Sequence, residues 1–151
     1  MELGTLRTLR DLIQMINAHY SDKKNVISQL CEHASLLNTT EGQRLYPGIV
    51  VESHLDQDYF DVRFVGRCFR FTLQLYWNAE VGSVTALSCC EIFPTELDIK
   101  PKPIYKISID QRGVTESLSV DPPGNTYKAD CTDRNDALRL ILQGIFTGLA
   151  K

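Results

Sequence analysis

Hydrophobic and polar residues alternate most regularly between Tyr59 and Trp77, and this stretch is predicted to be a β-hairpin. On either side of Gly66-Arg67, every second residue is apolar, which is typical of strands with one buried and one wet face. A two-residue connection that begins with glycine favours a type II′ turn. The apolar face of the predicted hairpin consists of Phe60, Val62, Phe64, Phe69, Phe71 and Leu73.

The predicted turn also fixes which residues face each other across the hairpin. The apolar pairs are then Phe64/Phe69, Val62/Phe71 and Phe60/Leu73. On the polar face, Arg63 is predicted to lie opposite Arg70. Like charges in this position are destabilising unless an anion lies between them. Asp61 on the same face is one source of that anion, and a carboxylate or phosphate of a binding partner is the other.

Apolar residues at helical spacing before the hairpin predict two helices, at residues 5–20 and 23–37. The first carries one apolar stripe, formed by Leu6, Leu9, Leu12, Ile13, Ile16 and Tyr20. Ser21-Asp22 is predicted to break the helix and to cap the second one, because serine and aspartate are favoured N-cap residues. Residues 38–42 are predicted to be a polar loop by composition.

The rest of the chain predicts further strands and one closing helix. The strands are expected in the second half of residues 43–53, at 83–93, at 104–110, at 114–120 and, in short form, at 126–128. A proline-rich link, Pro94 to Pro103, is the longest interior connection. Thr132 or Asp133 is predicted to cap a helix over residues 134–149 with a broad apolar face.

Strands in a continuous run with no intervening helix predict an α+β fold with segregated helices. The expected architecture is an N-terminal helical hairpin, an antiparallel β-meander of six to seven strands and a C-terminal helix packed on the sheet. The length of 151 residues predicts a single domain, 1–151. Within it we expect the helical hairpin at 5–37, the sheet at 45–128 and the closing helix at 133–149. Whether the sheet is open or barrel-like is left undecided by the pattern.

Composition narrows the classes of function. The net charge of −3 gives no support for electrostatic binding of the whole protein to nucleic acid or to an anionic membrane. The first residues lack the layout of a secretory signal, and no apolar run approaches the roughly 18 residues of a membrane span. The five cysteines are odd in number and lack C-x-x-C spacing, which is typical of reduced thiols. We therefore expect a cytoplasmic protein.

Candidate chemistry is sparse. His54 lies in an acidic stretch with Glu52, Asp56 and Asp58, and an imidazole beside carboxylates can act as a general base or a metal ligand. Exposed turns are, however, commonly acidic without any such role. The sequence contains no phosphate-binding, zinc-protease, serine-hydrolase or calcium-loop motif. We therefore predict no catalytic residue, no metal site and no cofactor.

The polar face of the hairpin is the predicted binding surface. It combines arginine with tyrosine, as interface cores do, in Tyr59, Arg63, Arg67, Arg70 and Tyr76. These features favour a small cytosolic protein-binding module, such as an adaptor, chaperone, inhibitor or subunit, that acts through a sheet surface without catalysis. A homodimer is expected. Nucleic-acid binding through the same arginines is a weaker hypothesis than protein binding or the small-molecule alternative given next.

The alternative is a small-molecule-binding protein or enzyme. A curved sheet closed by the C-terminal helix can enclose an apolar pocket. The residues expected to line such a pocket are His54, Phe60, Phe71, Trp77 and Tyr105. A sheet face completely filled by helices would argue against this hypothesis.

Overall fold

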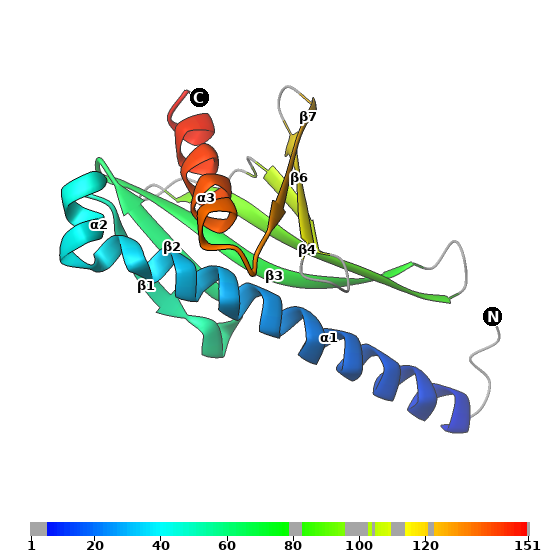
Figure 1. Ribbon diagram of the computed structural model, residues 1–151. Helices are drawn as coiled ribbons and strands as arrows, with labels where there is room; N and C mark the ends of the chain where they lie inside the picture. Colours follow the sequence, from blue (N-terminus) through cyan, green and yellow to red (C-terminus); the bar gives the residue numbers. More distant parts are fainter. Residues whose placement is uncertain are drawn as a thin grey trace.

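The computed structural model describes residues 6–78, 83–95, 103, 105–109, 114–120 and 123–150. The elements in chain order are α1 (Leu6–Ala34), η1 (Ser35–Asn38), α2 (Thr40–Leu45), β1 (Val50–His54), η2 (Leu55–Gln57), β2 (Tyr59–Phe64), β3 (Arg67–Asn78), β4 (Ser83–Thr95), β5 (Tyr105–Ile109), β6 (Val114–Val120), β7 (Pro123–Asp130) and α3 (Arg134–Leu149). Figure 1 shows a long N-terminal helix, an antiparallel sheet and a C-terminal helix. The predicted α+β class, with its antiparallel sheet and C-terminal helix, is confirmed.

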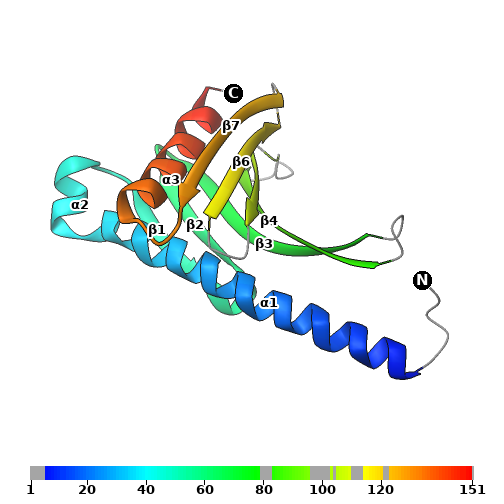
Figure 2. The ribbon, with the colours of Figure 1, turned by 45° about the vertical axis from the view of Figure 1, so that its right-hand side comes forward.

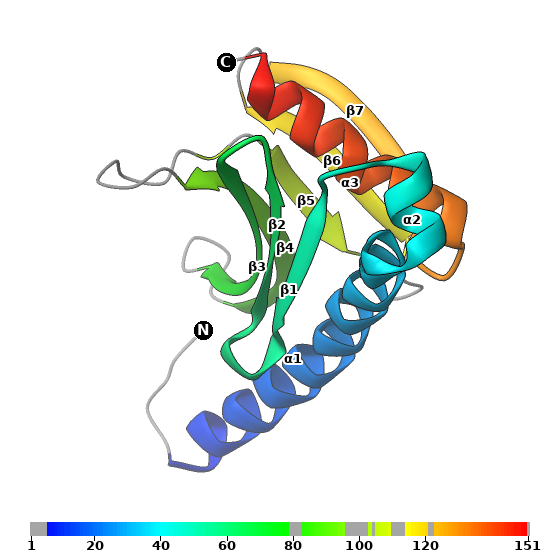
Figure 3. The same ribbon diagram turned by 90° about the vertical axis from the view of Figure 1, so that its left-hand side faces the viewer.

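The described strands follow one another in the sheet in the order of the sequence, β1 to β7, and each neighbouring pair is antiparallel. The sheet is curved, and α3 and the C-terminal half of α1 lie against its concave side (Figure 3). Apolar side chains from both helices and the sheet form one core, which includes Ile27, Leu30, Phe60, Phe69, Phe71, Ile107, Ile141 and Ile145. The concave face is therefore the structural face of the sheet.

The predicted N-terminal helical hairpin is wrong, because α1 is a single helix from Leu6 to Ala34. Ser21 and Asp22 are exposed positions in its interior. Serine and aspartate in a helix cost only about half a kcal/mol each relative to alanine, and no glycine or proline accompanies them. The two residues therefore resemble a cap in sequence without ending the helix.

Residues 38–42, predicted to be a loop, contain the start of the short helix α2. The Thr39 side chain accepts a hydrogen bond from the Gly42 backbone N–H, as an N-cap does. A Cβ atom at Gly42 would lie 2.2 Å from the Leu36 carbonyl oxygen. Glycine is therefore required there, because η1 and α2 approach too closely for any side chain.

The predicted hairpin is present, but its register is shifted by two residues. Phe60 faces Phe71 and Asp61 faces Arg70, whereas the sequence predicted Leu73 and Thr72 in these places. The turn consists of Val65 and Gly66, both with positive φ, of 47° and 78°. This combination is characteristic of a type I′ turn, and a shift by two leaves every side chain on its predicted face.

The closing helix is confirmed. Asp133 caps α3 by accepting hydrogen bonds from the backbone N–H groups of Asn135 and Asp136. Near the other end, the Tyr105 and Thr147 hydroxyl groups share a hydrogen bond of 2.5 Å. This bond joins β5 to the last turns of the helix and fixes α3 on the sheet.

Some predicted features lie partly or wholly outside the described residues. The proline-rich link from Pro94 to Pro103 falls largely in this category, since residues 96–102 are not described. The predicted short strand at 126–128 is part of the longer strand β7.

Candidate functional site

The outer face of β1, β2 and β3, opposite the core, carries a group of interacting polar side chains. Glu52 of β1 faces Asp61 of β2, which in turn faces Arg70 of β3. Two residues farther along β1, His54 faces Tyr59. Successive strand residues point to opposite faces, so these side chains share one surface while their neighbours enter the core.

Two ion pairs organise this outer face. Arg70 donates from Nε and Nη2 to the two carboxylate oxygens of Asp61, at 2.9 and 3.2 Å. Arg63 donates from Nε to Glu52 Oε1 at 3.1 Å. Asp61 is only 2% exposed, so its charge requires a partner such as Arg70. The hydrogen bond that Arg70 donates to Asp61 raises the pKa of Arg70 above its usual value.

The Tyr59 ring contacts two polar side chains of this face, Arg70 and His54. The Arg70 guanidinium carbon lies 3.9 Å from the centre of the Tyr59 ring, in a cation–π contact. The His54 ring lies 4.9 Å from the same ring, tilted by 30°. Tyr59 therefore positions both an imidazole and a guanidinium on the outer face.

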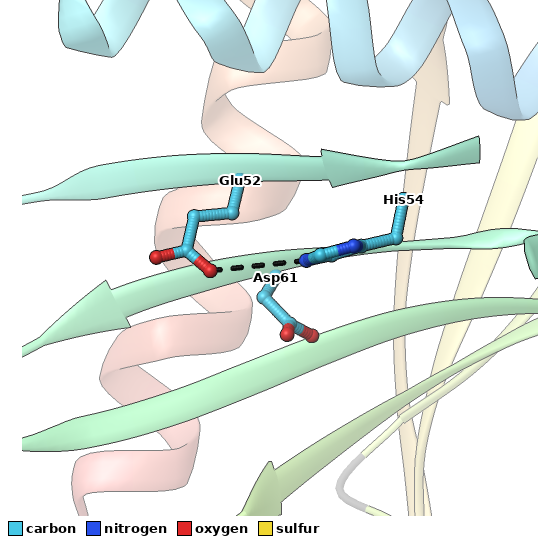
Figure 4. Close-up of side chains that lie close together, drawn as sticks. All are labelled: Glu52, His54 and Asp61. Carbon is cyan, nitrogen blue, oxygen red and sulfur yellow. Dashed lines mark ion pairs between the residues drawn. The ribbon is translucent and has the colours of Figure 1, made fainter. Parts of the chain in front are cut away.

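Glu52, His54 and Asp61 form a group of potential metal ligands (Figure 4). One ligand atom from each lies within 4.8 Å of the others. The closest marked approach joins His54 Nε2 and Glu52 Oε2, at 3.8 Å. Figure 4 shows both side chains reaching from β1 across the strand that carries Asp61.

Three of the predicted partner-binding residues, Tyr59, Arg63 and Arg70, lie on this outer face. The predicted pairing of Arg63 with Arg70 is wrong, because each arginine is bonded to a carboxylate instead. Arg67 lies apart from them, since its Nη1 donates to the Gly148 carbonyl at the end of α3, at 3.1 Å. Tyr76 belongs to β3, and its side chain is outside the described set.

The residues predicted to line a pocket do not share one surface. Phe60 and Phe71 stack with ring centres 4.8 Å apart and are completely buried in the core. Tyr105 is buried there too, whereas His54 belongs to the outer face of the sheet. Only the strand position of Trp77 is described. The described side chains therefore give the pocket hypothesis no support.

The sequence places His54 beside Glu52 as a candidate ligand, but it does not bring Asp61 into the group. The i, i+2 spacing of Glu52 and His54 in a strand was a usable signal, since it places both on one face. Asp61 was harder to assign, because its place opposite Glu52 depends on the pairing of β1 with β2.

A second surface lies on the N-terminal half of α1. Figures 1 and 2 show this half diverging from the sheet toward its N-terminus. Leu9, Ile13 and Ile16 are 38%, 58% and 37% exposed. They continue the stripe that Ile27, Leu30, Cys31 and Ala34 bury in the core farther along the same helix. We call these three side chains the exposed stripe of α1.

Tyr20 contacts Asp58 at a point between the exposed stripe of α1 and the buried C-terminal half of the helix. The Tyr20 hydroxyl donates to the Asp58 carboxylate at 2.5 Å, and Lys24 Nζ lies 3.4 Å from the same group. The hydrogen bond to Asp58 raises the pKa of Tyr20, with a smaller contribution from burial. These contacts tie the helix to the turn between β1 and β2.

A comparison of the chain with protein-family models, curated proteins and solved structures finds no match. Across the described part of the chain, no helix has both the length and the apolar content needed to cross a membrane. The two surfaces described above therefore provide the basis for assigning a function.

Proposed function

We propose that this chain is a small, single-domain, cytosolic protein-binding module without catalytic activity, and that its principal binding surface is the exposed stripe of α1. The observation that carries the proposal is the contrast along one helix. The apolar side chains are buried from Val26 to Ala34, whereas Leu9, Ile13 and Ile16 are exposed in the N-terminal half and only Leu12, among the described stripe residues between 9 and 16, is buried there.

An amphipathic helix gains stability mainly by burying its apolar face, and not from its intrinsic helix propensity. Exposed apolar side chains that adjoin one another on a helix are a common mark of a protein-binding surface. A partner that covers Ile13 and its neighbours would extend the burial already present in the C-terminal half of α1. The partner's contact surface must therefore be apolar.

The first partner to test is a second copy of the chain. Two copies of the exposed stripe are both apolar, so they can cover each other about a two-fold axis, as in most symmetric dimers. We expect a homodimer in which the N-terminal halves of two α1 helices pack together.

The test compares two matched pairs of substitutions on the same part of α1. Ile13→Ser with Ile16→Ser changes the exposed stripe, and Gln14→Ser with Asn17→Ser changes two exposed polar residues at the same spacing. Size-exclusion chromatography with light scattering at micromolar concentration should give a dimer for the wild type and the polar control. The Ile13/Ile16 variant should be a monomer, and its circular dichroism spectrum should match that of the wild type.

A monomeric wild type would rule out the homodimer, and the next test would be for a different protein partner. In that case, a protein captured from a cell extract should bind the wild type and the Gln14/Asn17 control but not the Ile13/Ile16 variant. Equal capture by all three proteins would show that the exposed stripe is not the binding surface.

The outer face of β1–β3 is a second candidate binding surface, favoured by its exposed Arg63 and its ordered Tyr59. Arg63→Glu is the appropriate variant, because the Arg63 side chain is 55% exposed. Arg70 is unsuitable, since its replacement would leave the buried Asp61 without its guanidinium partner. Loss of partner binding in Arg63→Glu, with binding retained in the Ile13/Ile16 variant, would favour the sheet surface over the helix.

A further inference from the structure

The outer face of the sheet brings together donors that can hold a metal ion. Glu52 and Asp61 are direct neighbours across β1 and β2, and His54 lies two residues from Glu52 on the same face. Their ligand atoms all lie within 4.8 Å of one another. One imidazole nitrogen and two carboxylate oxygens therefore converge from two adjacent strands.

Each of the three donors is held by a different neighbour. Asp61 is fixed by two hydrogen bonds from Arg70, and His54 rests on the Tyr59 ring. Arg63 holds Glu52 through Oε1, which leaves Oε2 facing the imidazole. Groups that orient ligands in this way are a regular part of metal sites in proteins, because they reduce the cost of ordering the ligands.

We propose that Glu52, His54 and Asp61 form a binding site for a divalent transition-metal ion of the Zn²⁺ type. Imidazole nitrogen and carboxylate oxygen are normal ligands of Zn²⁺, with bonds of about 2.0–2.2 Å. Ca²⁺ and Mg²⁺ fit this donor set poorly, because they favour sites built from oxygen ligands alone. The site therefore discriminates between the two classes of cation through His54.

The geometry requires a modest contraction. Two tetrahedral ligands with bonds of about 2 Å lie roughly 3.3 Å apart. His54 Nε2 and Glu52 Oε2 are 3.8 Å apart, and no two of the three ligand atoms are more than 4.8 Å apart. Their side chains are 40% and 43% exposed, so both can rotate toward an ion while Asp61 stays in place. Three protein ligands leave a fourth position open to water or to a partner's side chain.

Charge balance limits the affinity. The two carboxylates are paired with two guanidinium groups, so the local charge before binding is close to neutral. An ion gains less from such a site than from a bare carboxylate cluster. We expect binding in the micromolar range, and this binding is independent of the exposed stripe of α1.

The experiment follows the NMR signals of the histidine imidazole rings directly. The chain has three histidines, so protein labelled with ¹⁵N-histidine gives three ring systems in long-range ¹H–¹⁵N spectra. On titration with ZnCl₂, the ring assigned to His54 by the His54→Ala variant should shift, while His19 and His33 should not. In calorimetry, His54→Ala and Glu52→Gln should each weaken Zn²⁺ binding by about tenfold or more.

The matched control is Glu41→Gln. Glu41 is an exposed carboxylate paired with Arg44, as Glu52 is paired with Arg63, but it lies on α2 away from any histidine in the group. Its substitution should leave Zn²⁺ binding unchanged. If His54→Ala failed to fold, the His19→Ala and His33→Ala variants would assign the remaining ring to His54. The shift of that ring in the wild type and the loss in Glu52→Gln would still decide the question.

Three results would overturn the proposal. The first is an unchanged His54 ring at millimolar Zn²⁺, and the second is an equal loss of binding in Glu41→Gln. The third is displacement of Zn²⁺ by equimolar Ca²⁺, which would show a non-selective acidic surface.

Discussion

The two halves of α1 carry the same apolar pattern but have opposite environments. In the C-terminal half, Ile27, Leu30 and Ala34 are completely enclosed by the sheet and α3. In the N-terminal half, Ile13 and Ile16 occupy the same stripe but remain exposed. The difference shows that the amphipathic pattern determines which face of a helix is apolar. The packing of the rest of the chain determines whether that face is buried.

The substitution Leu30→Ala tests the buried half of α1. Leu30 is 1% exposed, and Leu30→Ala should lower the free energy of unfolding by roughly 2–5 kcal/mol, because it removes buried methyl groups and leaves a cavity. Ile13→Ala, at the corresponding face of the exposed half, should change the stability of the monomer by less than about 0.5 kcal/mol. Urea unfolding followed by circular dichroism measures both. Similar losses in the two variants would contradict the comparison.

Proline at position 22 tests whether the two halves are one helix. Asp22→Pro removes a backbone donor and clashes with the carbonyl group of Ala18, which costs about 3 kcal/mol in a helix interior. We expect a clear loss of helical ellipticity, since a detached segment of residues 6–21 would be too short to stay helical alone. Asp22→Ala is the control and should retain the wild-type spectrum. A helical hairpin with its break at Ser21-Asp22 would instead tolerate the proline.

The sequence predicted elements whose signals are local. Asp133 followed by apolar residues at helical spacing predicted α3 with its correct limits. Alternation predicted the burial of Phe60, Val62, Phe69, Phe71 and Leu73 in the hairpin, but not that of Asp61 on the opposite face. The sequence did not predict the continuity of α1, because Ser21-Asp22 fits both a cap and an exposed helix interior. The coverage of the Ile13 face depends on contacts distant in sequence, so it could not be predicted from the periodic pattern.

Only part of the candidate site could be predicted, and the reason is related to the one for α1. Alternation repeats every two residues, so it cannot distinguish registers that differ by two. The sequence favoured a turn at Gly66-Arg67, because a connection that begins with glycine suits a type II′ turn. The observed turn instead places Val65 at a positive φ, which valine rarely adopts. In the observed register, Arg70 faces Asp61 instead of Arg63, so a like-charge pair is replaced by an ion pair. That choice of register also gives the buried Asp61 its guanidinium partner beside Glu52 and His54.

The smallest expected effect concerns the junction between the halves of α1. Tyr20→Phe removes the hydrogen bond to Asp58 and should cost about 1 kcal/mol, since the site is only partly buried. The pKa of Tyr20 is raised above its usual 10.0, mainly by this hydrogen bond. A raised pKa means that the stabilisation is fully present below pH 10.0, the usual value, and is lost as the pH rises through the pKa of the folded protein.

The difference in stability between the wild type and Tyr20→Phe should therefore stay constant near neutral pH and diminish in alkaline solution. Urea unfolding at a series of pH values measures it, with Tyr46→Phe as a control at an exposed tyrosine. Hydrogen exchange in residues 6–19 should also accelerate in Tyr20→Phe, while exchange in the segment from Val26 to Ala34 should not change. Acceleration in both segments would mean that the contact at Asp58 supports the whole helix and does not separate a buried half from an exposed one.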